Sequence, residues 1–306
     1  MTLNFRFGGY QGENSVHTRA LRRLAAALER RLSGAARVLV TANVAEQGYK
    51  AADLLKLVAE GAFDICYFQS SYLDTAKVPA LRALDLPFLL TDRGTIYERL
   101  DGAFGAHLAQ AVADALPYRV LAFWDNGFRH ISNAVRPIRA PRDCTGLRMR
   151  TTASPLHQRI FAAFGFSPIA VDPADLPAAV AAGRVDAQEN PLTNFVNFGI
   201  HRHHMHLTLT SHFFGCAPLL VNRARYDALP RDLQEALRSA AAEATEAQRA
   251  FAQAEDAQCR AVIDAAGVGI LEAEEVDLAA FRAAAAPVVA HEKHAIGQSV
   301  MALLDA

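Results

Sequence analysis

The chain has 306 residues, of which 52% are hydrophobic and 21% are charged, and 31 basic against 32 acidic side chains leave a formal net charge of −1. This balance excludes a strongly basic nucleic-acid-binding protein and a highly charged disordered chain. The length suits two domains or one large one. Since no apolar run approaches the ~18 residues of a membrane span, we expect a soluble globular protein that does not itself cross a membrane.

The four cysteines are too few and too scattered for a disulfide-rich scaffold or a zinc ribbon, and we expect most of them to be buried apolar side chains. They are Cys66, Cys144, Cys216 and Cys259. No basic and apolar leader follows Met1. The protein is therefore expected to be either cytoplasmic or a mature chain whose leader has been removed.

Strand-like and helix-like segments alternate through the first half of the chain. Hydrophobic patterns predict helices at 18–32 and 51–60, and strands at 3–7, 37–41, 63–68, 118–124 and 146–151. Such alternation is typical of α/β proteins with a mostly parallel sheet.

Residues 231–266 contain neither glycine nor proline and carry apolar side chains at mainly three- and four-residue spacing. Pro230 and Gly267 are suitable start and stop signals. As one helix the segment would be roughly 54 Å long, more than the ~30 Å diameter of a small domain. We expect a single helix, straight or bent, that joins two domains, with a broken helix or two helices as alternatives.

The common catalytic motifs are absent from the sequence. There is no G-x-S-x-G, Walker or G-x-G-x-x-G motif in the required context. A histidine cluster, His201, His203, His204 and His206, could bind a metal, but no carboxylate or cysteine stands beside it at ligand-like spacing. We therefore favour a solvated helix end or loop for the cluster, and we favour metal binding by His291 and His294 still less.

Polar residues, several of them arginines, follow predicted strands. Asn126 and Arg129 come after an apolar strand, Arg148 and Arg150 alternate along another, and Asn190 ends Q-E-N-P. Ligands of open α/β sheets bind beyond the carboxyl ends of strands, and the planar guanidinium pairs well with carboxylates. From spacing alone, a carboxylate site and ordinary structural salt bridges are equally supported.

Several segments also match the motifs of a known family, in that family's order and over nearly the whole chain. They are L-D-L-P-F-L-L at 84–90, L-D-G-A-F-G at 100–105, R-P-I-R-A-P-R-D-C-T-G at 136–146, G-L-R-M-R-T at 146–151, F-G-F-S-P at 164–168, G-R-V-D-A-Q-E-N-P-L at 183–192 and L-P-R-D-L-Q-E-A at 229–236. On these segments the chain resembles the solute receptors of tripartite ATP-independent periplasmic (TRAP) transporters.

The resemblance implies a two-domain fold like that of periplasmic binding proteins, with a ligand cleft between the domains and a long helix spanning both. We expect domain I at 1–124 plus 213–252 and domain II at 125–212 plus 253–306. The implied function is to bind a small organic carboxylate in the periplasm, without catalysis, cofactor or metal. Domain closure would hold the ligand, which would be delivered to a membrane permease.

The resemblance also implies site residues. Arg150 matches the family's carboxylate anchor, Arg129 its second arginine, and Asn190 an asparagine that binds the same carboxylate, whereas Arg148 falls at a variable position. Further candidates by position are Tyr10, Gln69, Ser71, Trp124, Asn126, His212 and Phe214.

The chain departs from the family after F-G-F-S-P. Pro173 stands where many relatives have an aromatic residue and Pro177 where they have a tyrosine, so one stacking wall is missing and the ligand's identity cannot be transferred. Asp125 could accept a hydrogen bond from the ligand or cap a turn. Alternative functions are an α/β enzyme that uses the His201–His206 cluster, or an extracytoplasmic carboxylate sensor.

Overall fold

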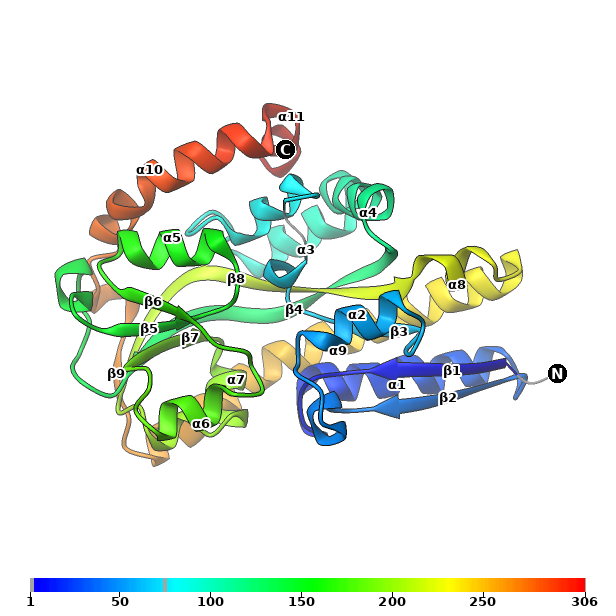
Figure 1. Ribbon diagram of the computed structural model, residues 1–306, viewed down its shortest axis with the longest axis horizontal. Coiled ribbons are helices and arrows are strands. Elements are labelled where there is room, and N and C mark those ends of the chain that lie inside the picture. The colour runs from blue at the N-terminus through cyan, green and yellow to red at the C-terminus, as the bar shows by residue number, and fades with distance from the viewer. Residues whose placement is uncertain (1–2, 74–75, 306) are drawn as a thin grey trace.

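The computed structural model describes residues 3–73 and 76–305, and in this part of the chain one nine-stranded sheet runs through the molecule (Figure 1). The strands are β1 (Leu3–Gly8), β2 (Ala36–Thr41), β3 (Ile65–Tyr67), β4 (Tyr118–Asn133), β5 (Arg148–Thr151), β6 (Ser167–Ala170), β7 (Ala187–Asn190), β8 (His206–Asn222) and β9 (Gly269–Leu271). The helices are α1 (Val16–Arg31), α2 (Asp53–Ala59), α3 (Arg93–Asp101), α4 (Ala103–Ala115), α5 (Pro155–Ala163), α6 (Leu176–Ala181), α7 (Leu192–Asn197), α8 (Arg223–Asp227), α9 (Arg231–Ala265), α10 (Leu278–Ile296) and α11 (Gln298–Asp305).

The molecule has two lobes, and two long antiparallel strands, β4 and β8, run through both of them. The sheet order is β2-β1-β3-β8-β4-β7-β5-β6, and β9 pairs with β8. One half of the β4–β8 ladder joins the parallel strands β1, β2 and β3, which we call the first lobe. The other half joins β5, β6, β7 and β9, the second lobe. The predicted two-domain α/β fold is confirmed.

The strand predicted at 118–124 is only the beginning of β4, which continues to Asn133. The register with β8 shifts between Asp125 and Phe128, a β-bulge that accommodates the polar residues D-N-G within the strand. The predicted strand end was therefore wrong, because a bulge and a strand end share the same polar and glycine signals.

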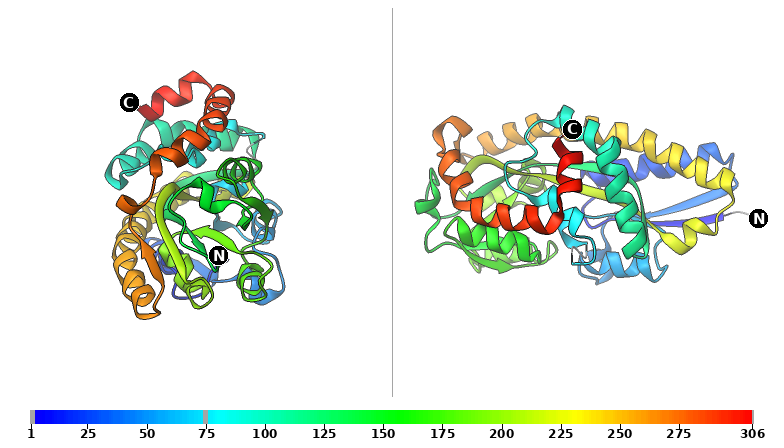
Figure 2. Two further views of the ribbon diagram at one scale, coloured as in Figure 1. Left: turned by 90° about the vertical axis from the view of Figure 1, so that its left-hand side faces the viewer. Right: turned by 90° about the horizontal axis from the view of Figure 1, so that it is seen from above.

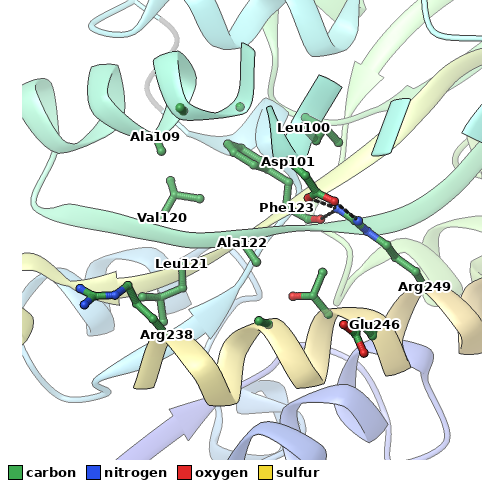
Figure 3. A pocket seen from close by; sticks show the side chains of 14 residues that line it. Leu100, Asp101, Ala109, Val120, Leu121, Ala122, Phe123, Arg238, Glu246 and Arg249 are labelled. Atoms are coloured by element: carbon green, nitrogen blue, oxygen red, sulfur yellow. Dashed lines mark hydrogen bonds and ion pairs between the residues drawn. The ribbon is translucent and has the colours of Figure 1, made fainter. Parts of the chain in front are cut away.

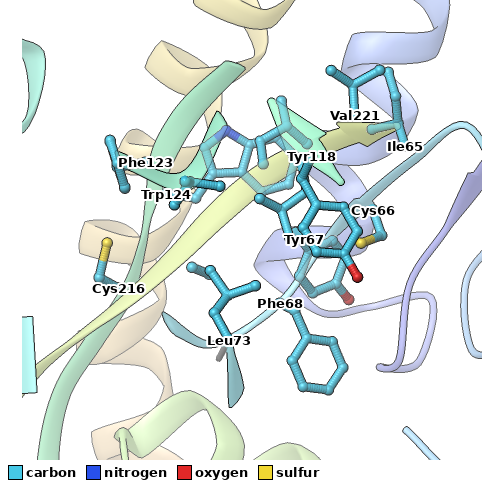
Figure 4. Packing of buried hydrophobic residues seen from close by; sticks show 14 of the residues in the cluster. Ile65, Cys66, Tyr67, Phe68, Leu73, Tyr118, Phe123, Trp124, Cys216 and Val221 are labelled. Atoms are coloured by element: carbon cyan, nitrogen blue, oxygen red, sulfur yellow. The ribbon is translucent and has the colours of Figure 1, made fainter. Parts of the chain in front are cut away.

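Separate hydrophobic cores fill the lobes. The first-lobe core includes Phe7, Tyr67 and Trp124. Figure 4 shows Tyr67 and Trp124 close together in this core. Two smaller cores, around Phe161 and Phe195, fill the second lobe. The predicted domain boundaries stay a prediction, and residues 296–304, which they assign to domain II, pack into the first-lobe core.

The long helix is α9, a single helix of 35 residues that begins directly after Pro230. It packs on α1 and β4 of the first lobe and on α7 of the second, so it spans both lobes as predicted (Figures 1 and 2). Its buried face is rich in alanine (Ala240, Ala241, Ala244 and Ala252), which lets the backbone approach its neighbours closely. No helix in the described parts of the chain is long and apolar enough to cross a bilayer.

Buried histidines make stability depend on pH. Burial lowers the pKa of His17 and of His130 to about 3 and that of His204 to about 4. An unfolded histidine titrates near pH ~6.5, so below that pH the unfolded chain takes up protons that the folded chain does not. Going from about pH 7.5 to about pH 5 should lower the free energy of unfolding by on the order of 1–2 kcal/mol per histidine.

Urea unfolding at the two pH values measures this difference. Replacing His17 by glutamine should reduce the pH dependence, whereas the same change at the exposed His107 should leave it as it is. Equal free energies of unfolding at both pH values would contradict the argument.

Candidate functional site

The carboxyl ends of the parallel strands of both lobes face one another, and a small cavity of about 20 Å³ lies between them. Its walls come from the segments that follow β1, β3, β5, β6 and β7 and from the bulge of β4. The lining residues are Tyr10, Gln69, Tyr72, Asn126, Arg129, Arg150, Thr152, Pro173, Asn190, Asn194 and Phe198. This is the position at which open α/β sheets bind ligands.

Arg150, on β5, is 2% exposed. Its Nε donates to the carbonyl of Val171 (2.9 Å) and its Nη2 to the hydroxyl of Tyr72 (3.3 Å). Among the residues that the structure describes, no carboxylate forms an ion pair with it. A guanidinium has five N–H donors, so several remain available. A buried charge without a counter-charge is costly, and its presence beside a cavity points to an anion as ligand.

Arg129, on β4, differs because its charge is compensated within the protein. Both oxygens of the fully buried Glu189 accept hydrogen bonds from it, and its Nη2 also donates to Asn190 Oδ1 (3.2 Å). His212 Nε2 lies 3.4 Å from Glu189 Oε2. Burial raises the pKa of Glu189, but Arg129 and His212 outweigh it and hold that pKa well below its usual range. The carboxylate is therefore ionised at neutral pH.

The β4 bulge places Asn126 beside the cavity. Gly127 follows with φ +83°, and a Cβ atom there would lie 2.7 Å from Cβ of Pro191, so only glycine fits this position. Asp125 accepts a hydrogen bond from the backbone N–H of Gly127 and pairs with Arg93 (2.9 Å). Of its two predicted roles, the structure therefore supports the turn cap.

Six of the ten predicted site residues line the cavity: Arg150, Arg129, Asn190, Gln69, Asn126 and Tyr10. The other four lie elsewhere. Trp124 is fully buried in the first-lobe core (Figure 4). Its Nε1 donates to the hydroxyl of Thr245 of α9 (3.0 Å). Phe214 packs edge-on against Phe128 in the same core.

Ser71 and His212 are close to the cavity without lining it. The hydroxyl of Ser71 faces that of Thr152 across the lobes at 3.5 Å. His212 stands behind Arg129, next to Glu189, with Nδ1 2.7 Å from the hydroxyl of Thr210. Both are placed to support the cavity walls.

Five lining residues were not among the predicted site residues: Tyr72, Thr152, Pro173, Asn194 and Phe198. Tyr72 and Thr152 each follow a predicted strand closely, which was a usable signal. Phe198 comes directly after α7 and supplies an aromatic side chain to the cavity. Pro173, at the position where the resemblance implies an aromatic residue in many relatives, does not. Nothing in the local sequence distinguishes Phe198 from a core residue.

The histidine cluster does not converge on one point. Only His201 and His204 are buried, and they contact different partners, the carbonyl of Phe195 (3.4 Å) and the hydroxyl of Ser132 (3.0 Å). In the described parts of the chain no three His, Cys, Asp or Glu side chains are grouped to hold a metal ion. All four cysteines are free and buried, as predicted.

A wider groove of about 370 Å³ lies outside the cleft, between α4 and α9 over the outer part of β4 (Figure 3). Its floor is apolar, with Val120, Leu121 and Ala122. Arg249 on its edge is already paired with Asp101 (2.6 Å). Because this groove does not combine a buried unpaired charge with strand ends, we do not assign the ligand to it.

The chain matches the bacterial extracellular solute-binding proteins of family 7 over residues 7–295. It is 32% identical over 289 residues to a solute-binding protein of Verminephrobacter eiseniae, covering 94% of this chain and 84% of the relative. Two solved TRAP periplasmic solute-binding proteins, each 26% identical, have the same fold. One, from Polaromonas sp. JS666, is bound to D-erythronate (TM-score 0.93; 99% of this chain and 98% of that chain covered). The other, from Sulfurospirillum deleyianum, holds succinate (TM-score 0.91; 100% and 99%).

These comparisons agree with the TRAP resemblance in the sequence. They do not support the alternative of an α/β enzyme, because the family and its solved members are binding proteins. The expected location in the periplasm is likewise confirmed. The chain belongs to the bacterial extracellular solute-binding proteins of family 7, the periplasmic receptors of TRAP transporters.

Proposed function

We propose that this receptor binds a small organic monocarboxylate through Arg150 and delivers it to a TRAP membrane permease. The observation that carries the proposal is the charge balance of the cavity. Two buried arginines line it, and Glu189 neutralises only Arg129. A single carboxylate on Arg150 would restore neutrality, in a bidentate geometry that guanidinium groups favour.

The charge balance also indicates how many carboxylates the ligand carries. A second carboxylate would bring a negative charge into a buried cavity that has no further unpaired cation among the described residues, which is costly. The relatives bind both kinds of acid, since D-erythronate has one carboxylate and succinate has two. The site geometry therefore favours the monocarboxylate for this chain.

A thermal-shift screen of organic acids tests the proposal directly. A ligand that binds only the folded protein raises the melting temperature with its concentration. We expect a dose-dependent rise with at least one monocarboxylate and a smaller rise with the dicarboxylate of the same carbon skeleton. No shift with any aldonate, uronate, hydroxy acid or keto acid would argue against the proposal.

The proposed mechanism includes closure of the lobes over the acid, and one loop is positioned to couple closure to binding. Residues 171–175 follow β6 in the second lobe. Val171 accepts the hydrogen bond from Arg150, and Pro173 lines the cavity. In the same loop, Asp172 accepts hydrogen bonds from the backbone N–H groups of Ala51 and Ala52 in the first lobe, both at 3.2 Å.

A second contact of this loop crosses the lobes beside the first. Lys50 Nζ lies 2.7 and 2.8 Å from the two carboxylate oxygens of Asp175. An acid held by Arg150 would thus fix the loop in the position that closes the lobes. This arrangement would favour the closed state only through contacts made in that state, as a population shift requires.

Replacing Asp172 by alanine should therefore weaken acid binding by about five- to thirty-fold, because two charge-assisted hydrogen bonds of the closed state are lost. Lys50→Ala should cost only about two- to five-fold, since both partners of that pair are largely exposed. Calorimetric titration measures both effects. Lys56→Ala, which removes an exposed pair within the first lobe, is the matched control and should bind like the native protein. Native affinity in the Asp172 variant would exclude the loop as a closure contact.

A further inference from the structure

Two amide side chains of the cavity form a pair that is incompletely satisfied. Asn126 Nδ2 donates to Gln69 Oε1 at 2.7 Å. The two residues are 2% and 3% exposed, and both line the cavity. Gln69 Nε2 and Asn126 Oδ1 are buried atoms that have no hydrogen-bond partner in the described parts of the chain. The pair therefore offers one free donor group and one free acceptor.

This conclusion does not depend on how the amides are turned. If both were flipped, Gln69 Nε2 would donate to Asn126 Oδ1, leaving Asn126 Nδ2 as donor and Gln69 Oε1 as acceptor. Each amide has one carbonyl oxygen and one NH₂ group. Joining two of them by one hydrogen bond always leaves a donor and an acceptor side by side.

The other side-chain amides of the cavity are already satisfied by protein. Asn190 donates from Nδ2 to Gln188 (2.5 Å) and accepts from Arg129 and Asn194. Asn194 Oδ1 accepts from Gln11 Nε2 across the lobes at 3.1 Å. Among the arginine and amide side chains that line the cavity, the unpaired donors and acceptors thus lie on Arg150 and on the Gln69–Asn126 pair.

We propose that the solute carries a hydroxyl group that binds to the Gln69–Asn126 pair, so that the receptor selects hydroxy monocarboxylates over keto and unsubstituted acids. A hydroxyl accepts from the free N–H and donates to the free carbonyl at once. A keto oxygen can only accept, which leaves the amide carbonyl buried and unpaired. An unsubstituted carbon satisfies neither atom. This inference rests on the proposed binding of the carboxylate by Arg150.

The test compares matched acids on the native protein by calorimetric titration. The three-carbon set is lactate, pyruvate and propionate. The four-carbon set is α-hydroxybutyrate, β-hydroxybutyrate, D-erythronate, α-ketobutyrate, acetoacetate and butyrate. In at least one set, a hydroxy acid should bind at least about ten-fold more tightly than the keto and unsubstituted acids, because each of those leaves a buried polar atom unpaired.

Variants then assign the preference to the pair. The double substitution Gln69→Met with Asn126→Leu removes both amides, because either one alone still carries a free donor and a free acceptor. It should bring the hydroxy-to-unsubstituted affinity ratio toward one. Gln11→Met is the matched control, because Gln11 is an equally buried amide that does not line the cavity. It should weaken all the acids alike and leave the ratio as in the native protein.

The outcomes separate this inference from the function on which it rests. Equal or tighter binding of the keto or unsubstituted acids by the native protein overturns the hydroxyl assignment and leaves the Arg150 anchor intact. A native preference that survives in the double variant also overturns it. Failure of the native protein to bind any of these acids, D-gluconate or D-glucuronate counts against the proposed function itself.

Discussion

Replacing Arg150 by alanine should lower the affinity for the organic acid by about two to three powers of ten. The reason is that the acid's carboxylate would remain buried without its counter-charge, and removing one partner of a buried ion pair typically costs about 3–5 kcal/mol. Arg150→Lys should also bind poorly, since a point charge cannot replace two parallel N–H donors. Calorimetric titration with the tightest acid of the screen gives both values.

Removing the same guanidinium should not destabilise the ligand-free protein. Because the guanidinium is buried without a carboxylate partner, Arg150→Met should leave the melting temperature unchanged or raise it. A structural arginine would instead destabilise the fold when removed. Arg148→Ala is the matched control on the same strand, as its side chain is 46% exposed and pairs with Asp186. Unchanged affinity in Arg150→Ala would refute the anchor assignment.

The sequence was most informative where local chemistry and three-dimensional position coincide. Arg150 and Asn190 stand in short strands whose carboxyl ends face the cleft, so their motifs pointed to a site before any fold was known. The long helix was equally readable, because 35 residues without a glycine or a proline have few other conformations.

Where the sequence did not predict which residues line the cavity, the reason is tertiary packing. Trp124 and Asn126 are two residues apart on β4 and were both expected in the site, yet only Asn126 lines the cavity, because a bulge between Asp125 and Phe128 disturbs the alternation of side chains. Phe198 reaches the cavity only because α7 packs against β4 and α9. Periodicity within a segment contains no information about which neighbouring segment covers it.

Replacing Glu189 by glutamine should both destabilise the protein and change which acids it prefers. The variant leaves Arg129 buried without a counter-charge, and the loss of a fully buried partner is expected to lower the free energy of unfolding by about 3–5 kcal/mol. Since Arg129 lines the cavity, its charge would become available to a second carboxylate. The affinity for succinate relative to butyrate should therefore rise by about ten-fold or more compared with the native protein.

Glu292 provides the matched control for this double effect. It is also fully buried and ion-paired, with Arg82 and Arg159, but it does not line the cavity. Because both of its arginines are partly exposed, Glu292→Gln should cost less stability, and it should leave the succinate-to-butyrate ratio as in the native protein. Urea unfolding and titration of both variants give the comparison. A Glu189 variant that loses stability but keeps the native ratio would mean that Arg129 supports the cavity wall without contributing its charge to ligand selection.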